Sequence, residues 1–251
     1  MQVTAYAKTV MLAGEKTIPQ NKPQSNKYEV IDQLGTGVWK VVDRKTKTPW
    51  TMKRVDRMTA SGSAEVDLLT RLDHHGIPPV MDWEVDEGGI WMVYRHIKGR
   101  GLHTWIGHDL PEGQLINWAI QVAEILVYLH DQEPFPLIHR DIKPANILVD
   151  DQDHVWLIDF GAAVEGSLSA LHAALPLATP YYAAPEQVFC PDQVSPRTDM
   201  YGFGMTLHRL AGDRLVRLSL PLQQVIRRAI AIQPKNRFAD MREITNILKS
   251  L

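Results

Sequence analysis

One short stretch, residues 139–161, constrains this chain more than any other, and it reads HRDIKPANILVDDQDHVWLIDFG. Asp141 and Asn146 stand five residues apart on a loop that contains proline, and Asp159 follows thirteen residues after Asn146. The connector predicts a hairpin, with strands NILV and HVWLI around the turn DDQD. Because a hairpin folds the chain back on itself, we expect Asp159 to return beside Asn146.

The side chains that this hairpin brings together suit phosphate chemistry. Asn146 and Asp159 offer the hard oxygen ligands that Mg²⁺ takes when it carries a phosphate. Asp141 is then available to accept a proton from an attacking hydroxyl, and Lys143 can neutralise charge on a moving phosphoryl group. His139 is expected to pack the loop rather than to shuttle protons, because Asp141 already fills the role of the base.

The pattern of apolar residues changes once along the chain. From Tyr28 to about Val93, short β-branched segments alternate with turns, and one helix is expected near residues 63–72. From about Leu102 helices dominate, among them the amphipathic stretch LINWAIQVAEILVYLH. We therefore predict an α+β chain with a small β-rich lobe followed by a larger helical lobe. The expected boundaries are 1–27 for an extension and linker, 28–94 for the small lobe, 95–98 for a hinge and 99–251 for the large lobe.

Composition excludes several classes of protein. A formal net charge of −2 argues against a footprint for nucleic acid or for an anionic membrane surface. The single cysteine, Cys190, excludes an internal disulfide framework and fits a reducing compartment. No apolar run approaches the ~18 residues that a membrane-spanning helix needs, and the first residues lack the layout of a signal peptide. We therefore expect a cytoplasmic protein.

The opening motif resembles a known family. HRDIKPANIL together with DFG is similar to the catalytic loop and the metal-binding motif of eukaryotic-like protein kinases of the bacterial kind. The resemblance implies a two-lobed kinase fold in which Asp141 is the catalytic base and Asn146 and Asp159 bind Mg²⁺. Lys143 marks the Ser/Thr class of these enzymes.

Three further segments carry the same resemblance, which runs from about Tyr28 to Leu251. TPYYAAPEQ resembles the end of a kinase activation segment, with Thr179 in the turn that binds the substrate. RTDMYGFG resembles the segment whose aspartate, here Asp199, supports the catalytic loop. Arg237 in QPKNRF matches the arginine that pairs with Glu186.

The resemblance also assigns residues to the nucleotide, with one departure. Lys53 matches the lysine that holds the α- and β-phosphates, and Glu65 on the expected helix matches its ion-pair partner. The family covers the phosphates with G-x-G-x-x-G-x-V, whereas LGTGVWKVV stops after Gly35 and Gly37 before reaching Val38. We expect a shorter hairpin and weaker binding of ATP, since fewer backbone N–H groups face the phosphates.

The stretch WMVYRHIKGRGL is similar to the hinge between kinase lobes. By this resemblance Tyr94 is the gatekeeper, the backbone from Arg95 to Ile97 binds the base, and Leu148 packs under the adenine ring.

The segment that follows the DFG motif lacks positive charge. No lysine or arginine occurs between Gly161 and Arg197, and SLSALHAALPLA has leucines at helical spacing behind Ser167. We favour a short packed helix here over a switch phosphorylated at Ser167, Ser169 or Thr179, because Arg140 alone makes a poor phosphate clamp.

The resemblance leads to one main hypothesis and two rivals. The main one is an ATP- and Mg²⁺-dependent protein serine/threonine kinase that transfers a γ-phosphoryl group to a protein substrate. The first rival is a pseudokinase scaffold, motivated by the shortened loop. The second, a small-molecule kinase, is disfavoured because such enzymes lack a peptide-docking segment like TPYYAAPEQ. The oligomeric state stays open. Two interpretations of residues 1–27 also stay open: a tail without fixed structure, or, because VTAYAKTVML alternates, a strand or lid of the small lobe.

Overall fold

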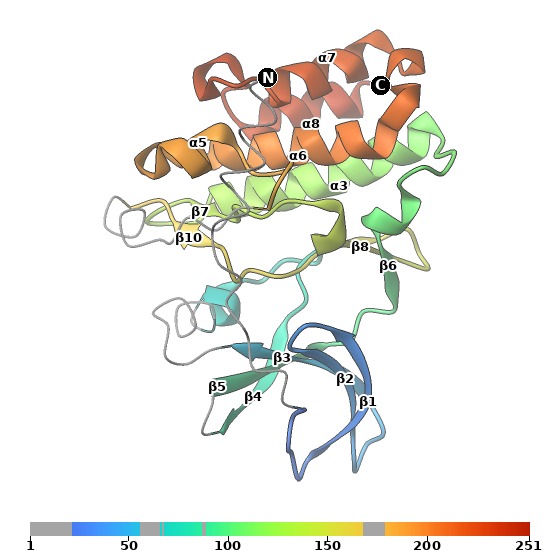
Figure 1. The fold of residues 1–251 in the computed structure, drawn as a ribbon, viewed down its shortest axis with the longest axis vertical. Coiled ribbons are helices and arrows are strands. Elements are labelled where there is room, and N and C mark those ends of the chain that lie inside the picture. Colours follow the sequence, from blue (N-terminus) through green and yellow to red (C-terminus); the bar gives the residue numbers. More distant parts are fainter. Residues whose placement is uncertain (1–21, 56–65, 67, 87–88, 168–178) are drawn as a thin grey trace. The chain divides into compact units, whose positions relative to one another are not determined.

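A computed structural model describes residues 22–55, 66, 68–86, 89–167 and 179–251. The chain divides into two compact units, and the division falls between Lys98 and Gly99. The described residues up to Lys98 are called the sheet unit, and those from Gly99 onward are called the helical unit (Figure 1).

The sheet unit is built on five antiparallel strands in the order β1-β2-β3-β5-β4. Their bounds are β1 Tyr28–Gly35, β2 Val38–Asp43, β3 Pro49–Val55, β4 Val80–Asp86 and β5 Gly89–Arg95. These strands confirm the segments expected from the β-branched pattern. The structure also confirms helix at residues 66 and 68–71, while residues 56–65 and 67 lie outside the described part of the chain.

One face of this sheet forms a hydrophobic core. Buried side chains from four strands meet there: Tyr28, Val41, Met52, Trp91 and Val93. On β1, β2 and β3 they alternate with more exposed residues, so the period of two places one apolar row inside, whereas on β5 Met92 between Trp91 and Val93 is buried as well. Each such side chain removed from water stabilises the fold by about 1.5–3 kcal/mol.

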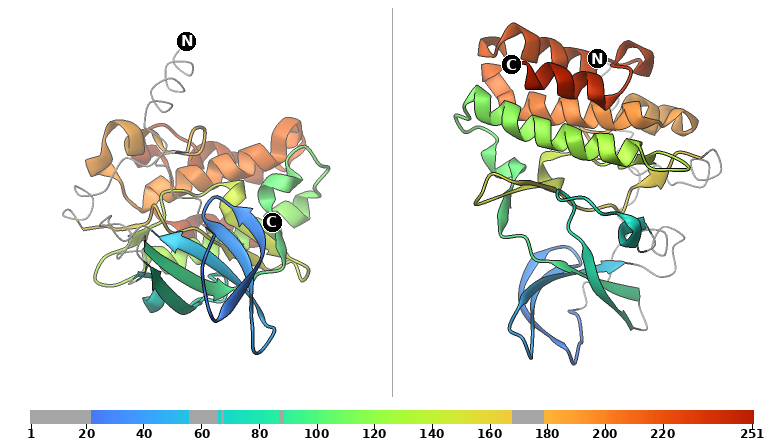
Figure 2. Two further views of the ribbon diagram at one scale, coloured as in Figure 1. Left: turned by 60° about the horizontal axis from the view of Figure 1, so that its bottom comes forward. Right: turned by 180° about the vertical axis from the view of Figure 1, so that it is seen from behind.

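The helical unit is built mainly on α-helices. Their bounds are α3 Glu112–His130, α5 Pro185–Phe189, α6 Pro196–Ala211, α7 Leu220–Ala229 and α8 Met241–Lys249. Helix α3 packs against α8 and α6, and α6 packs against α7, which gives the layered bundle of Figures 1 and 2. The apolar row of α3 is buried, as its sequence pattern predicts. Within the described residues, no helix is both long and apolar enough to cross a membrane.

Short strands and 3-10 helices carry the loops of this unit. The strands are β6 Gly99–Gly101, β7 Leu137–Ile138, β8 Ile147–Asp150, β9 Val155–Leu157 and β10 Val164–Glu165. The 3-10 helices are η1 Leu102–Trp105, η2 Pro144–Asn146, η3 Pro191–Gln193, η4 Gly212–Arg217 and η5 Pro234–Asn236. Strands β8 and β9 pair as an antiparallel hairpin, which confirms the expectation for the stretch after Asn146. Strand β7 pairs with β10, and the loop between β7 and η2 holds Asp141.

Candidate active site

Four polar side chains converge on the loop between β7 and β8. The Thr179 hydroxyl donates to Asp141 Oδ1 at 2.6 Å, and Lys143 Nζ donates to Asp141 Oδ2 at 2.7 Å. Lys143 also reaches Thr179 Oγ1 at 2.9 Å, and the Asn146 amide donates to Asp141 Oδ2 at 2.9 Å. The Asp141 carboxylate is therefore fixed from three sides, while part of it stays open to solvent. Asp141, Lys143, Asn146 and Thr179 are called the loop cluster below.

A buried carboxylate on α6 holds this loop from behind. Asp199, in the first turn of α6, accepts the backbone N–H of His139 at 2.9 Å and of Arg140 at 2.8 Å. The His130 Nε2 atom lies 3.0 Å from Asp199, and the Asp199 side chain is 0% exposed. These contacts confirm the support that the RTDMYGFG segment led us to expect. They also hold Arg140 at φ 65°, a left-handed conformation that costs energy for a residue with a side chain.

A glycine lets α6 approach the loop this closely. A Cβ atom at Gly202 would lie 2.8 Å from the Ile142 carbonyl oxygen and 3.0 Å from the Ile142 Cβ. Ile142 is next to Asp141, so any larger residue at 202 would push the loop cluster away from α6.

His139 is a structural residue of the loop, as expected. It is completely buried, it meets the ring of Phe160 edge-on at 4.8 Å, and its Nδ1 accepts the Asp141 N–H at 3.3 Å. Burial lowers the pKa of His139 below its ordinary value of 6.5. The imidazole is thus neutral near pH 7.

The β8–β9 hairpin brings Asp159 back toward Asn146. The Ile158 N–H donates to the Asn146 carbonyl oxygen at 2.9 Å, so the residue before Asp159 is bonded directly to Asn146. Asp159 is exposed and has φ 66°, and its Oδ1 accepts the Gly161 N–H at 3.4 Å. The described residues contain no group of three or more His, Cys, Asp or Glu side chains that could hold a metal by themselves. Asn146 and Asp159 stay a predicted pair of metal ligands.

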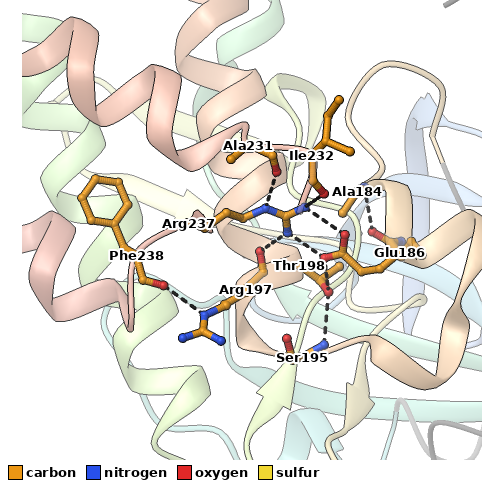
Figure 3. A network of polar contacts seen from close by, with 10 residues as sticks. Ala184, Glu186, Ser195, Arg197, Thr198, Ala231, Ile232, Arg237 and Phe238 are labelled. Atoms are coloured by element: carbon orange, nitrogen blue, oxygen red, sulfur yellow. Dashed lines mark hydrogen bonds and ion pairs between the residues drawn. The ribbon is translucent and has the colours of Figure 1, made fainter. Parts of the chain in front are cut away.

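A buried ion pair fixes the segment that follows Thr179 (Figure 3). Arg237 binds both oxygens of Glu186, at 2.6 and 2.9 Å, and the side chains are 0% and 2% exposed. The guanidinium also donates to carbonyl oxygens of Arg197, Ala231 and Ile232. This pair confirms the partnership expected from the sequence, and it ties the start of α5 to the chain before α8.

The sheet unit positions the residues assigned to the nucleotide. Gly35 pairs with Val38, which leaves a two-residue turn, so the expected shorter hairpin is confirmed. Gly37 in that turn has φ 69°, where glycine is strongly favoured. Val38 is the cross-strand neighbour of Lys53, and the two residues therefore share one face of the sheet.

The remaining nucleotide candidates are divided between the units. Arg95 ends β5 and is exposed, and Ile97 is half-buried. Between them, His96 Nδ1 lies 3.0 Å from the Thr51 hydroxyl. Leu148 lies on β8 in the helical unit, where it is half-buried. Glu65 and the expected helix behind Ser167 lie outside the described residues.

Comparison with known proteins assigns the family. Residues 28–250 match the protein kinase domain. The chain belongs to the protein kinase family. Its fold, with a β-sheet region followed by a helical region, is that of this family.

Relatives of this protein kinase come from plants and bacteria. LysM domain receptor-like kinase 3 of Medicago truncatula is 31% identical over 80% of this chain and 33% of its own length. Serine/threonine-protein kinase RUNKEL of Arabidopsis thaliana is 29% identical over 73% of this chain and 14% of its own length. A Clostridium acetobutylicum protein named as a probable serine/threonine-protein kinase is 25% identical over 90% of this chain and 40% of its own length. The chain thus spans 40% or less of the length of each of these relatives.

Three contacts in the structure were not predicted from the sequence. His130 bonds to Asp199, Gln187 donates to the Arg140 carbonyl oxygen at 2.8 Å, and Gly202 makes room for Ile142. His130 ends an amphipathic helix, where a histidine is unremarkable, and Gln187 lies in a short helix without periodicity. Only the pair of glycines in YGFG offered a signal, because glycine inside a helix usually has a packing reason.

Proposed function

We propose that this chain is an ATP- and Mg²⁺-dependent serine/threonine kinase that transfers the γ-phosphoryl group of ATP to a protein hydroxyl. The observation that carries the proposal is the loop cluster, in which a partly exposed carboxylate is fixed by a threonine, a lysine and an amide. The likeness to the Clostridium acetobutylicum protein, which covers 90% of this chain, supports a kinase of the bacterial kind.

Asp141 acts as the general base in this proposal. Its Oδ1 accepts the Thr179 hydroxyl at 2.6 Å, and a substrate hydroxyl at that carboxylate would occupy an equivalent position. The proton of the attacking hydroxyl passes to Asp141 as the new oxygen–phosphorus bond forms. Lys143, at 2.7 Å from the same carboxylate, places a positive charge where negative charge moves during transfer.

Asn146 and Asp159 fit the role of metal ligands. The Asn146 amide nitrogen is turned toward Asp141, which leaves the amide oxygen to coordinate. The Asp159 carboxylate is exposed and lies one residue after the hairpin bond to Asn146. Bound Mg²⁺ would neutralise the charge of the triphosphate. Hard oxygen donors of this kind suit Mg²⁺ rather than a soft metal.

The residues proposed for the nucleotide are those that the family resemblance gives. Lys53 would bind the α- and β-phosphates with Glu65 as its partner, and the hairpin that carries Gly35, Gly37 and Val38 would cover them. The backbone of Arg95 and Ile97 and the side chain of Leu148 would bind the adenine base.

The alternative function is a nucleotide-binding scaffold without phosphoryl transfer. The two-residue turn between Gly35 and Val38 favours this alternative, because it leaves few backbone N–H groups to hold phosphates. The intact loop cluster favours the kinase.

The deciding experiment compares the wild-type chain with Asp141→Asn, using labelled ATP, Mg²⁺ and histone or casein. We expect transfer by the wild type and a loss of at least ~10³-fold in the variant, with an unchanged melting temperature, because the base acts mainly in the transition state. Binding of ATP without transfer by the wild type would identify the scaffold. Activity of Asp141→Asn within a few-fold of wild type would refute the role of Asp141.

A further inference from the structure

Gln187 joins the segment that follows Thr179 to the loop that carries Asp141. It lies in α5 and is 3% exposed, and its Nε2 atom donates to the Arg140 carbonyl oxygen at 2.8 Å. Its Oε1 atom accepts the Ala184 N–H at 3.4 Å. The first partner requires a donor and the second requires an acceptor, and an amide side chain supplies one of each. An aliphatic residue at position 187 would lose both bonds.

The bond from Gln187 acts on the peptide group that leads directly into Asp141. Arg140 is the residue before Asp141, and its φ of 65° is a left-handed conformation that the surrounding structure must hold in place. Asp199 accepts the Arg140 N–H at 2.8 Å, and Gln187 binds the carbonyl oxygen of the same residue. Both backbone polar groups of Arg140 are therefore held by buried side chains, one from α6 and one from α5.

Thr179 connects the same segment to the loop at a second point. Its hydroxyl donates to Asp141 Oδ1 at 2.6 Å, and its carbonyl oxygen accepts the Ala183 N–H at 3.0 Å. Ala184 is the next residue, and its N–H is bonded to Gln187. Hydrogen bonds and backbone thus form a closed ring from the Asp141 carboxylate through Thr179 and Gln187 back to the peptide group before Asp141. A change at Gln187 would reach Asp141 from both directions.

We propose that Gln187 is a positioning residue for phosphoryl transfer, which fixes the Asp141 carboxylate relative to the segment after Thr179 that is expected to hold the substrate. The pair of Glu186 and Arg237 anchors the residue before Gln187, so the amide extends from a fixed point. An error of about 1 Å in the placement of a reacting group can lower a rate about 100-fold. The inference rests on the proposed kinase function and deepens it, because Gln187 acts through Asp141.

Gln187→Met tests the proposal, because methionine has a similar length but no side-chain N–H group. The matched control is Gln193→Met, which makes the same change at an exposed residue of η3. Both variants are assayed beside the wild type with labelled ATP, Mg²⁺ and casein. If Gln187→Met melts too low to be assayed, Gln187→Asn replaces it with the same expectations, because its amide is shorter by one methylene group.

The steady-state constants distinguish positioning from a general effect on the fold. We expect kcat of Gln187→Met to fall about 10- to 100-fold while the KM for ATP stays within about twofold of wild type. The control should match the wild type in both constants. A kcat of Gln187→Met close to that of wild type would overturn the proposal. A rise in the KM for ATP as large as the fall in kcat would overturn it as well, because the change would then not be confined to the loop.

Amide hydrogen exchange, followed by mass spectrometry, gives a second measurement that does not depend on transfer. In Gln187→Met the amides of residues 139–146 should exchange about fivefold faster or more, whereas those of α8 should exchange as in the wild type. Unchanged exchange in residues 139–146 would contradict the proposal. Equally faster exchange in α8 would also contradict it, because the whole unit would then be less stable.

The two measurements separate this inference from the function on which it rests. If the wild type transfers no phosphate, the kinase function fails. Exchange in residues 139–146 then decides whether Gln187 holds Asp141 in place. If the wild type and Gln187→Met transfer phosphate equally well, the kinase function stands and the inference fails.

Discussion

The buried pair of Glu186 and Arg237 allows a stability prediction with a defined size. Replacing Arg237 with alanine removes a guanidinium that makes five hydrogen bonds, two of them to Glu186. Glu186 would remain buried with one bond from the Thr198 hydroxyl, and three carbonyl oxygens would lose a donor. Breaking a buried pair from one side costs about 3–5 kcal/mol. For a chain of this size, that corresponds to a fall in Tm of about 6–20 °C.

Circular dichroism melts of Arg237→Ala and of a matched control measure this cost. The control is Lys249→Ala, which removes a 2.7 Å ion pair with Glu124 between side chains that are 53% and 37% exposed. An exposed pair contributes at most about 1 kcal/mol, so the control should melt within ~4 °C of wild type. If Arg237→Ala melts no lower than Lys249→Ala, the buried pair does not stabilise the helical unit and the reasoning fails.

Three further predictions follow from the site and its surroundings. Burial lowers the pKa of His139 in the folded chain. As the pH falls below about 6.5, the unfolded chain therefore binds a proton that the folded chain does not, and stability should fall. His139→Phe should flatten that part of the curve of Tm against pH, and an unchanged curve would exclude His139 as its source. Asp159→Ala should weaken Mg²⁺-ATP binding at least ~10-fold in calorimetry, because the triphosphate loses a bridge to the protein, and an unchanged affinity would mean that Asp159 is not a ligand. If the extension covers apolar side chains of the sheet unit, each worth ~2 kcal/mol, deleting residues 1–20 should lower Tm and raise the KM for ATP. A truncated chain with the Tm and turnover of the full chain would show that the extension is a tail without such a role.

Local features of the site were predictable from the sequence. The hairpin after Asn146 involves residues close together in the chain, and its turn has the polar residues that such turns require. The shortened turn before Val38 was evident from the missing glycine, and the structure gives it as a two-residue turn. In both segments the neighbouring residues determine the conformation, so a linear pattern was enough.

Long-range contacts were predictable only where the family resemblance supplied them. Glu186 and Arg237 are far apart in the chain, and no periodic pattern connects them. The contact of His130 with Asp199 had no signal at all, because it depends on the crossing of α3 and α6. Contacts of this kind arise from packing between helices, and the sequence of either helix alone does not specify them.

The absence of lysine and arginine from residues 144–196 also decides how chemical modification of this protein can be mapped. Trypsin cleaves after lysine and arginine but not before proline, and Lys143 is followed by Pro144. Digestion therefore leaves Asp141 to Arg197 as a single long peptide, which holds Ser167, Ser169 and Thr179 together. A phosphate on any of these hydroxyls would be hard to locate in such a fragment by mass spectrometry. A protease that cuts after glutamate would divide the fragment at Glu165 and Glu186 and place all three hydroxyls on a shorter peptide.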